Sequence, residues 1–270
     1  MESLLSLSFD SLTSTSANKV RRGLKQLSGL LSQICLSHHS ATKPQAQPLK
    51  SLASDPAFRA FINLQDSFQY NVCVHLISCL ERLLGKGSSG ENDLLLIGCL
   101  ELLVGCLLIH RPSRELWRRE VNINLFLDLL DPSCCPAVHI ATLRALTVAL
   151  MDQPANIRVF EELDGLMVVT SLFKTRQTSL EVKKELIELL CFYLEKEVEV
   201  EDESVPARES ALLLGTSKDE VLEAFRRASR EQGSASANQT DKPILRTRHE
   251  KETLLGRHLG EEQLAVLCSG

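Results

Sequence analysis

Residues 156–194 read NIRVFEELDGLMVVTSLFKTRQTSLEVKKELIELLCFYL, and they contain one complete helical unit. Apolar residues recur at helical spacing in three segments, at 157–163, 166–173 and 182–194. Asp164 and Gly165 form a turn between the first two segments, and a polar loop separates the last two. The stretch therefore predicts a short helix, a turn, a second helix, a loop and a long helix. One such unit cannot bury its apolar faces alone, so copies of it are expected on either side.

The preceding residues supply such copies. An offset of 43 residues places Trp117 on Phe160, and the neighbouring apolar positions match as well. After the loop, a step of 44 residues takes the apolar pattern of 182–194 back to 138–150, and a second such step takes it to 94–106. Helical periods of about 40–47 residues are typical of armadillo and HEAT arrays. The sequence therefore predicts an all-α, armadillo/HEAT-like helical solenoid of about three repeats.

Three regions are expected along the chain. Residues 1–17 are rich in Ser and Leu and predict a flexible N-terminal arm, and residues 18–197 predict the armadillo-like domain, which opens with a helix capped by Asn18. Residues 198–270 predict a partly disordered tail, made of an acidic, low-complexity insert and a C-terminal helical segment. Its candidate docking residues are Leu254, Leu255, Leu259, Leu264 and Leu267.

Within the domain, residues 68–84 and 94–109 predict two further helices, and the second of these is expected to be the most buried helix of the array. Its apolar run is shorter than the ~20 residues of a membrane span. Five cysteines at apolar helical positions are expected to behave as small hydrophobes, namely Cys73, Cys79, Cys99, Cys106 and Cys191. Because no secretory signal is apparent, we expect a cytoplasmic protein with reduced thiols and no membrane insertion.

The composition argues against several kinds of partner and site. The net charge is −5 and aromatic residues make up 4% of the chain, so neither electrostatics nor base stacking favours nucleic acid. The segment GKGSSG at 85–90 matches a dinucleotide fingerprint by letters only, because it follows a helix rather than a strand. His38 and His39 lack the spacing of zinc ligands. His75 and His139 are expected to be surface or satisfied core residues. We therefore predict no enzyme activity, no cofactor and no metal.

Candidate partner-binding residues come from the array itself. Solenoids bind partners along the surface lined by the last helix of each unit, where Arg144 and Glu188 occupy equivalent positions. Arg118 and Arg119 form a small basic patch beside Trp117, which is itself expected in the core. For all four candidates the alternative is ordinary solvation of a surface charge.

Several stretches resemble one known family. They are KVRRGLKQLSGLLSQICL (19–36), DPAFRAFINLQDSFQYNV (55–72), RVFEELDGLMVVTSLFK (158–174) and RTRHEKETLLGRHL (246–259). Together they resemble the cell division control protein 14 family of fungi, a component of the septation initiation network. This family is distinct from the dual-specificity phosphatase of the same name, whose Cys-x5-Arg phosphate loop is absent here. The block at 64–68, LQDSF, is the most specific part of the resemblance.

The resemblance implies a non-catalytic regulatory or scaffold subunit. Its implied partner is a germinal-centre-type (sterile-twenty-like) protein kinase in the network that triggers septum formation and cytokinesis. It also implies recruitment to the spindle pole body. An alternative is a general armadillo-like adaptor for extended peptides, which would carry a regular Asn/Trp ladder that the sequence does not show. A cryptic enzyme with residues gathered from several loops is a third alternative, with no feature in its favour.

Overall fold

The computed structural model of the 270-residue chain describes residues 1–37, 45–46, 52–85, 90–197 and 245–260. These residues are helical apart from turns, loops and one antiparallel pair of two-residue strands, β1 (Leu36–Ser37) and β2 (Gln45–Ala46). The all-α class is therefore confirmed. The helices are α1 (Glu2–Thr13), α2 (Ala17–Cys35), α4 (Pro56–Gln65), α5 (Val72–Leu84), α6 (Asp93–Ile109), the 3-10 helix η1 (Arg111–Arg118), α7 (Glu120–Asp128), α8 (Pro136–Leu150), α9 (Pro154–Glu162), α10 (Gly165–Lys174), α11 (Leu180–Leu194) and α14 (Arg248–Gly256).

The helical unit predicted at 156–194 forms α9, α10 and α11, as expected from its apolar spacing. Pro154 opens α9, where a missing N–H costs nothing. Asp164 adopts the left-handed conformation, with φ of 56°, and turns the chain into α10. The Ser179 side chain caps α11 by accepting a hydrogen bond from the Val182 N–H at 3.4 Å. Local turn and cap chemistry thus sets all three helix starts.

Gly165 lies against the buried ring of Phe160 at this turn. A Cβ at Gly165 would lie 2.2 Å from Cε2 of Phe160 and 2.6 Å from its carbonyl oxygen. Because Phe160 is 1% exposed, its ring has no room to retreat. We expect Gly165→Ala to lower the free energy of unfolding by about 1–3 kcal/mol in urea denaturation. Gly29→Ala is the control, since a Cβ there meets nothing within 4 Å, and equal losses in both variants would contradict the prediction.

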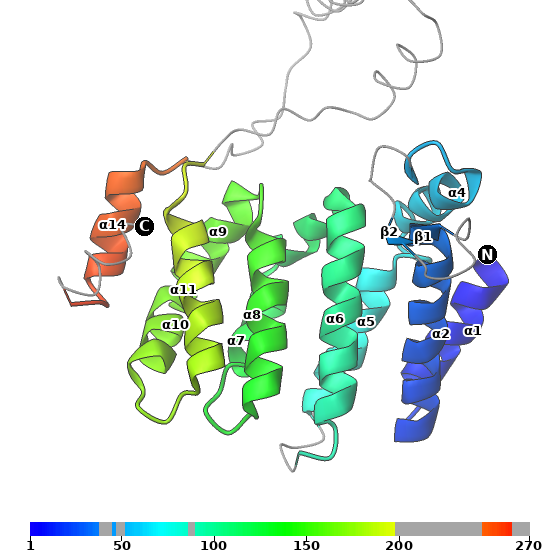
Figure 1. The fold of residues 1–270 in the computed structure, drawn as a ribbon, viewed down its shortest axis with the longest axis horizontal. Coiled ribbons are helices and arrows are strands. Elements are labelled where there is room, and N and C mark those ends of the chain that lie inside the picture. The colour runs from blue at the N-terminus through cyan, green and yellow to red at the C-terminus, as the bar shows by residue number, and fades with distance from the viewer. Residues whose placement is uncertain (38–44, 47–51, 86–89, 198–244, 261–270) are drawn as a thin grey trace, which may run out of the picture.

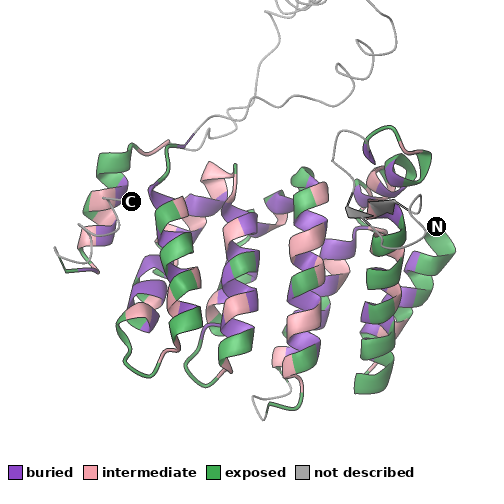
Figure 2. Cartoon of the chain, in the orientation of Figure 1, coloured by how far each residue is buried: buried purple, intermediate pink, exposed green. Residues whose placement is uncertain are grey.

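The helices form a long row with shorter helices behind it (Figure 1). α2 packs on α6, α6 on α8, and α8 on α11. α5, α7 and α10 lie behind this row (Figure 1). Buried positions of the chain gather between the two sets, and exposed positions run along the outer side of the row (Figure 2). We call the exposed surface of α6, α8 and α11 the row face.

Two predicted boundaries were wrong. The expected flexible arm at 1–17 contains α1, whose Leu5 and Leu12 are fully buried and which packs on α2. The helical spacing of its apolar residues was not recognised, because the segment is also rich in Ser. α5 begins at Val72 rather than at Phe68. The Gln65 side chain accepts a hydrogen bond from the Val72 N–H, and this contact closes a turn before the helix begins. Phe68 lies in that turn and is 76% exposed.

Two predictions about burial were also wrong. α8, rather than α6, is the more deeply buried helix, with ten of its 15 residues buried against seven of 17 in α6. α8 packs against α6, α7, α9, α11 and η1, whereas α6 exposes Leu94 and Leu108 at its two ends. Cys191 is exposed, unlike the other four cysteines assigned to apolar positions, which are buried as expected.

The C-terminal helix α14 packs back on α11, with Leu255 and Leu259 buried. Leu264 and Leu267 lie outside the described residues, as does most of the acidic, low-complexity insert. The docking is accompanied by a group of buried and partly buried charges that we call the Glu197 cluster, which consists of Arg158, Glu161, Glu197, Arg246 and Lys251.

The Glu197 cluster joins α9, the end of α11 and the C-terminal segment. Lys251 Nζ lies 3.0 Å from Glu197 Oε1, and Arg158 pairs with the same carboxylate. Arg246 Nε lies 2.8 Å from Glu161 Oε2. The side chains of Lys251 and Glu197 are 1% and 3% exposed, so this pairing is largely shielded from water.

Candidate functional site

The predicted residues Arg144 and Glu188 lie on neighbouring helices of the row face. Arg144 is on α8 and is 62% exposed, and Glu188 is an exposed residue of α11. Arg144 Nε donates a hydrogen bond of 2.9 Å to Oε1 of Glu185, which is also on α11. This hydrogen bond raises the pKa of Arg144, and the charges of Glu185, Glu188 and Glu101 raise it further. We call these four residues the Arg144 cluster.

The Arg144 cluster borders a hollow of about 360 Å³ between α6 and α8. Ile97, Val104 and Ile140 are apolar residues of its lining, and Glu101 and Arg144 are its charged residues. Three carboxylates and one guanidinium leave an excess of negative charge at this place. The row face can therefore accept an apolar side chain of a partner and hydrogen bonds from the partner's basic residues.

Sequence reasoning did not find Glu185 as the partner of Arg144. Glu185 lies three residues before Glu188, so both belong to the same side of α11. Which of the two meets Arg144 depends on how α8 and α11 are offset along their axes, and a repeat alignment does not contain this offset. The three-residue spacing of Glu185 and Glu188 was the signal in the sequence that both carboxylates belong to the side of α11 that meets Arg144.

The basic patch of Arg118 and Arg119 lies on other elements than the Arg144 cluster. Arg118 is the last residue of η1 and Arg119 follows it as the N-cap of α7, and both are exposed. The structure therefore does not place them on the helices that carry Arg144 and Glu188. Trp117 is fully buried, as expected for a core residue, and its indole stacks on Phe126 with ring centroids 5.3 Å apart.

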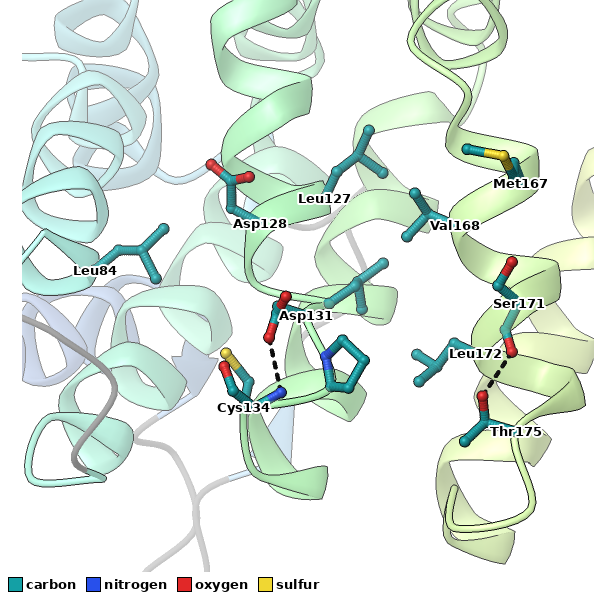
Figure 3. A pocket seen from close by; sticks show the side chains of 13 residues that line it. Leu84, Leu127, Asp128, Asp131, Cys134, Met167, Val168, Ser171, Leu172 and Thr175 are labelled. Atoms are coloured by element: carbon teal, nitrogen blue, oxygen red, sulfur yellow. Dashed lines mark hydrogen bonds between the residues drawn. The ribbon is translucent and has the colours of Figure 1, made fainter.

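A larger hollow, of about 630 Å³, is lined by residues of other helices (Figure 3). We call it the α7–α10 hollow, because most of its lining comes from α7, the turn after it, and α10. Its apolar lining residues are Leu84, Leu127, Leu130, Pro132, Met167, Val168 and Leu172. Asp128 and Asp131 bring two carboxylates to the lining. Sequence reasoning missed this hollow, because its walls come from segments separated along the chain.

His75 and His139, which the sequence predicts as surface or satisfied core residues, have structural partners. His139 is buried and its Nε2 lies 2.9 Å from the Asp131 carbonyl oxygen, while the ring of His75 stacks on Phe9. His38 and His39 lie outside the described residues. Among the described residues there is no group of three or more His, Cys, Asp or Glu side chains arranged to hold a metal ion. No single helix in the described ranges is long and apolar enough to cross a membrane, although α6 and η1 together, bent by 118°, pass the same test of length and composition.

Comparison with known proteins gives the family. The family model described as cell division control protein 14, septation initiation network component, matches residues 1–266. The chain belongs to this family. It is 28% identical to "Cell division control protein 14" of Schizosaccharomyces pombe over 205 residues, which cover 73% of this chain and 80% of the yeast protein. No solved structure is significantly similar to the chain.

Membership of the family confirms the resemblance found in the sequence. It assigns the chain to cell division and to the septation initiation network, and to a family distinct from the phosphatase of the same name. The Arg144 cluster, the basic patch at Arg118 and Arg119, and the α7–α10 hollow are candidate sites for contacts within that network.

Proposed function

We propose that this chain is a non-catalytic regulatory or scaffold subunit that binds a germinal-centre-type protein kinase of the septation initiation network. In this role it promotes septum formation and cytokinesis and is recruited to the spindle pole body. The observation that carries the proposal is family membership over residues 1–266. The exposed charges and the hollow on the row face supply a surface suited to a protein partner.

We further propose that α5 to α11 form an armadillo/HEAT-like solenoid of about three units. Its units are α5 with α6, then η1, α7 and α8, then α9, α10 and α11. Two similar contacts between neighbouring units support this division. The Asn71 side chain donates a hydrogen bond of 2.8 Å to Ser113 Oγ in the next unit. The Asn156 side chain donates a hydrogen bond of 2.8 Å to the Arg114 carbonyl oxygen in the unit before it.

We place the kinase on the row face, with contacts from Arg144 and Glu188, and treat Arg118 and Arg119 as a second contact. Tagged chain should be purified from dividing cells and its partners identified by mass spectrometry. We expect a stoichiometric germinal-centre-type kinase with the wild-type chain. We expect about tenfold less kinase with the double charge reversal Arg144→Glu/Glu188→Lys, which corresponds to a loss of about 1.4 kcal/mol of binding free energy.

The matched control is Glu2→Lys/Arg59→Glu, which also reverses one charge of each sign at exposed positions, on α1 and α4. If both double variants retain the kinase, the binding function stands and the assignment to the row face is wrong. A parallel reversal, Arg118→Glu/Arg119→Glu, then tests the basic patch. Recovery of unrelated extended peptides without any kinase would instead favour the general adaptor.

A further inference from the structure

We infer that the α7–α10 hollow is a second docking site, which takes a protein segment carrying apolar side chains next to a lysine or arginine. This inference goes beyond the proposed function, because the hollow is separate from the row face. The hollow is lined by residues of α5, α7 and α10 and of the turn after α7, whereas the Arg144 cluster lies on α6, α8 and α11.

The size and lining of the hollow suit side chains of a partner. Its volume of about 630 Å³ falls within the ~300–1,000 Å³ of clefts that bury ligands. Leu127, Val168 and Leu172 present apolar walls from two helices (Figure 3). Met167 lies on the α10 side and is 46% exposed, and an unbranched methionine adapts its shape to an apolar guest.

The charge of the lining selects a basic partner. The described residues that line the hollow include Asp128 and Asp131 and no lysine or arginine. Hydrogen bonds from the Ser133 hydroxyl and N–H hold the pKa of Asp131 below its usual range, so this carboxylate stays ionised. Asp128 is exposed on α7. An ammonium or guanidinium group beside the apolar guest would therefore meet complementary charge.

The walls of the hollow are ordered by their own hydrogen bonds. The Ser133 N–H donates a hydrogen bond of 2.8 Å to Asp131 Oδ1, and the Cys134 N–H donates a hydrogen bond of 2.9 Å to the Asp131 carbonyl oxygen. On the opposite wall, the Thr175 hydroxyl donates 2.9 Å to the Ser171 carbonyl oxygen (Figure 3). Because both walls are fixed before binding, a partner segment would lose little free energy in ordering them.

These hydrogen bonds also favour a peptide over a small polar ligand. The Ser133 N–H and the Thr175 hydroxyl already donate within the walls. The carboxylates of Asp128 and Asp131 offer acceptors only. An apolar residue next to Lys or Arg matches this combination of apolar walls and acceptors.

The test uses random dodecapeptides displayed on phage and selected on the full-length chain. We expect the enriched peptides to share Leu, Ile or Met next to Lys or Arg. Binding of one enriched peptide is then measured by fluorescence polarisation. Met167→Asn is expected to weaken it by about tenfold, because the polar but uncharged amide would have to be buried beside the apolar guest. The control is Val121→Asn, which places the same amide at a 58% exposed position of α7 outside the hollow and is expected to leave binding unchanged.

A charge exchange tests the electrostatic part. Asp128→Lys is expected to weaken the basic peptide about tenfold and to bind the same peptide better when its Lys or Arg is replaced by Glu. The inference is overturned if no peptide is enriched, if the enriched peptides lack basic residues, or if Met167→Asn and Val121→Asn bind the selected peptide alike. None of these outcomes depends on whether the kinase binds the row face.

Discussion

Replacing Glu197 with alanine is expected to detach α14 from α11, at a cost to docking of about 3–5 kcal/mol. In the native chain three cations, Arg158, Arg246 and Lys251, face two carboxylates, Glu161 and Glu197. Without Glu197 they would face one. Burial lowers the pKa of Lys251, and Glu197 is the main group that opposes this effect. A buried cation that has lost its carboxylate returns to water most easily by leaving with its helix.

Hydrogen–deuterium exchange measures this detachment directly. We expect the backbone amides of 248–259 to exchange up to about two to three orders of magnitude faster in Glu197→Ala, while α6 and α8 keep their protection. The matched control is Glu195→Ala, two residues away. Glu195 is exposed and contributes its backbone carbonyl oxygen to Lys251, a contact that alanine preserves. If the two variants exchange alike, the Glu197 cluster does not hold α14 in place.

Trp117→Ala is expected to lower the free energy of unfolding by about 3–5 kcal/mol. The indole is fully buried and stacks on Phe126, so its removal leaves a cavity between η1 and α7. Urea denaturation monitored by circular dichroism measures the loss. A loss below about 1 kcal/mol would contradict the burial on which this prediction rests.

Trp117→Phe separates the cavity from the chemistry of the indole. The indole Nε1 has no hydrogen-bond partner among the residues that the structure describes, so phenylalanine removes an unsatisfied donor as well as apolar volume. Phe160 also occupies the position 43 residues later in the repeat pattern. We therefore expect Trp117→Phe to lower the free energy of unfolding by less than about 2 kcal/mol, which is a smaller loss than that expected for Trp117→Ala.

The sequence predicted the helices whose apolar residues follow a clear helical period and whose ends carry recognisable caps. α11 is one example, because its apolar residues at 182–194 follow the helical period and the Ser179 side chain caps it. α1 was missed because its buried Leu5 and Leu12 are embedded in a Ser-rich segment that suggests an arm. The start of α5 was misplaced because the Gln65 side chain ends the turn by a contact seven residues along the chain.

In the candidate sites, too, the features set by local sequence were predictable and those set by the packing of distant segments were not. Exposure of Arg144 and Glu188 was predictable, since charged residues on an amphipathic helix face water. The pairing of Arg144 with Glu185 depends on the packing offset of two helices, which no local pattern contains. Glu197 belongs to an acidic run that favours solvation, and its basic partners come from distant segments. The α7–α10 hollow likewise exists only once three separate segments have been brought together.

The row face and the α7–α10 hollow would allow one chain to hold two partners at once. They lie on different helices and have different linings, and both have an excess of carboxylates among their described charged residues. A scaffold needs such separate surfaces, because a partner on one must leave the other accessible.

Calorimetric titration of the purified germinal-centre-type kinase into the purified chain measures whether the proposed complex forms. We predict a saturable complex with the wild-type chain and about tenfold weaker binding with Arg144→Glu/Glu188→Lys. Absence of any binding by the wild-type chain would contradict the proposed function.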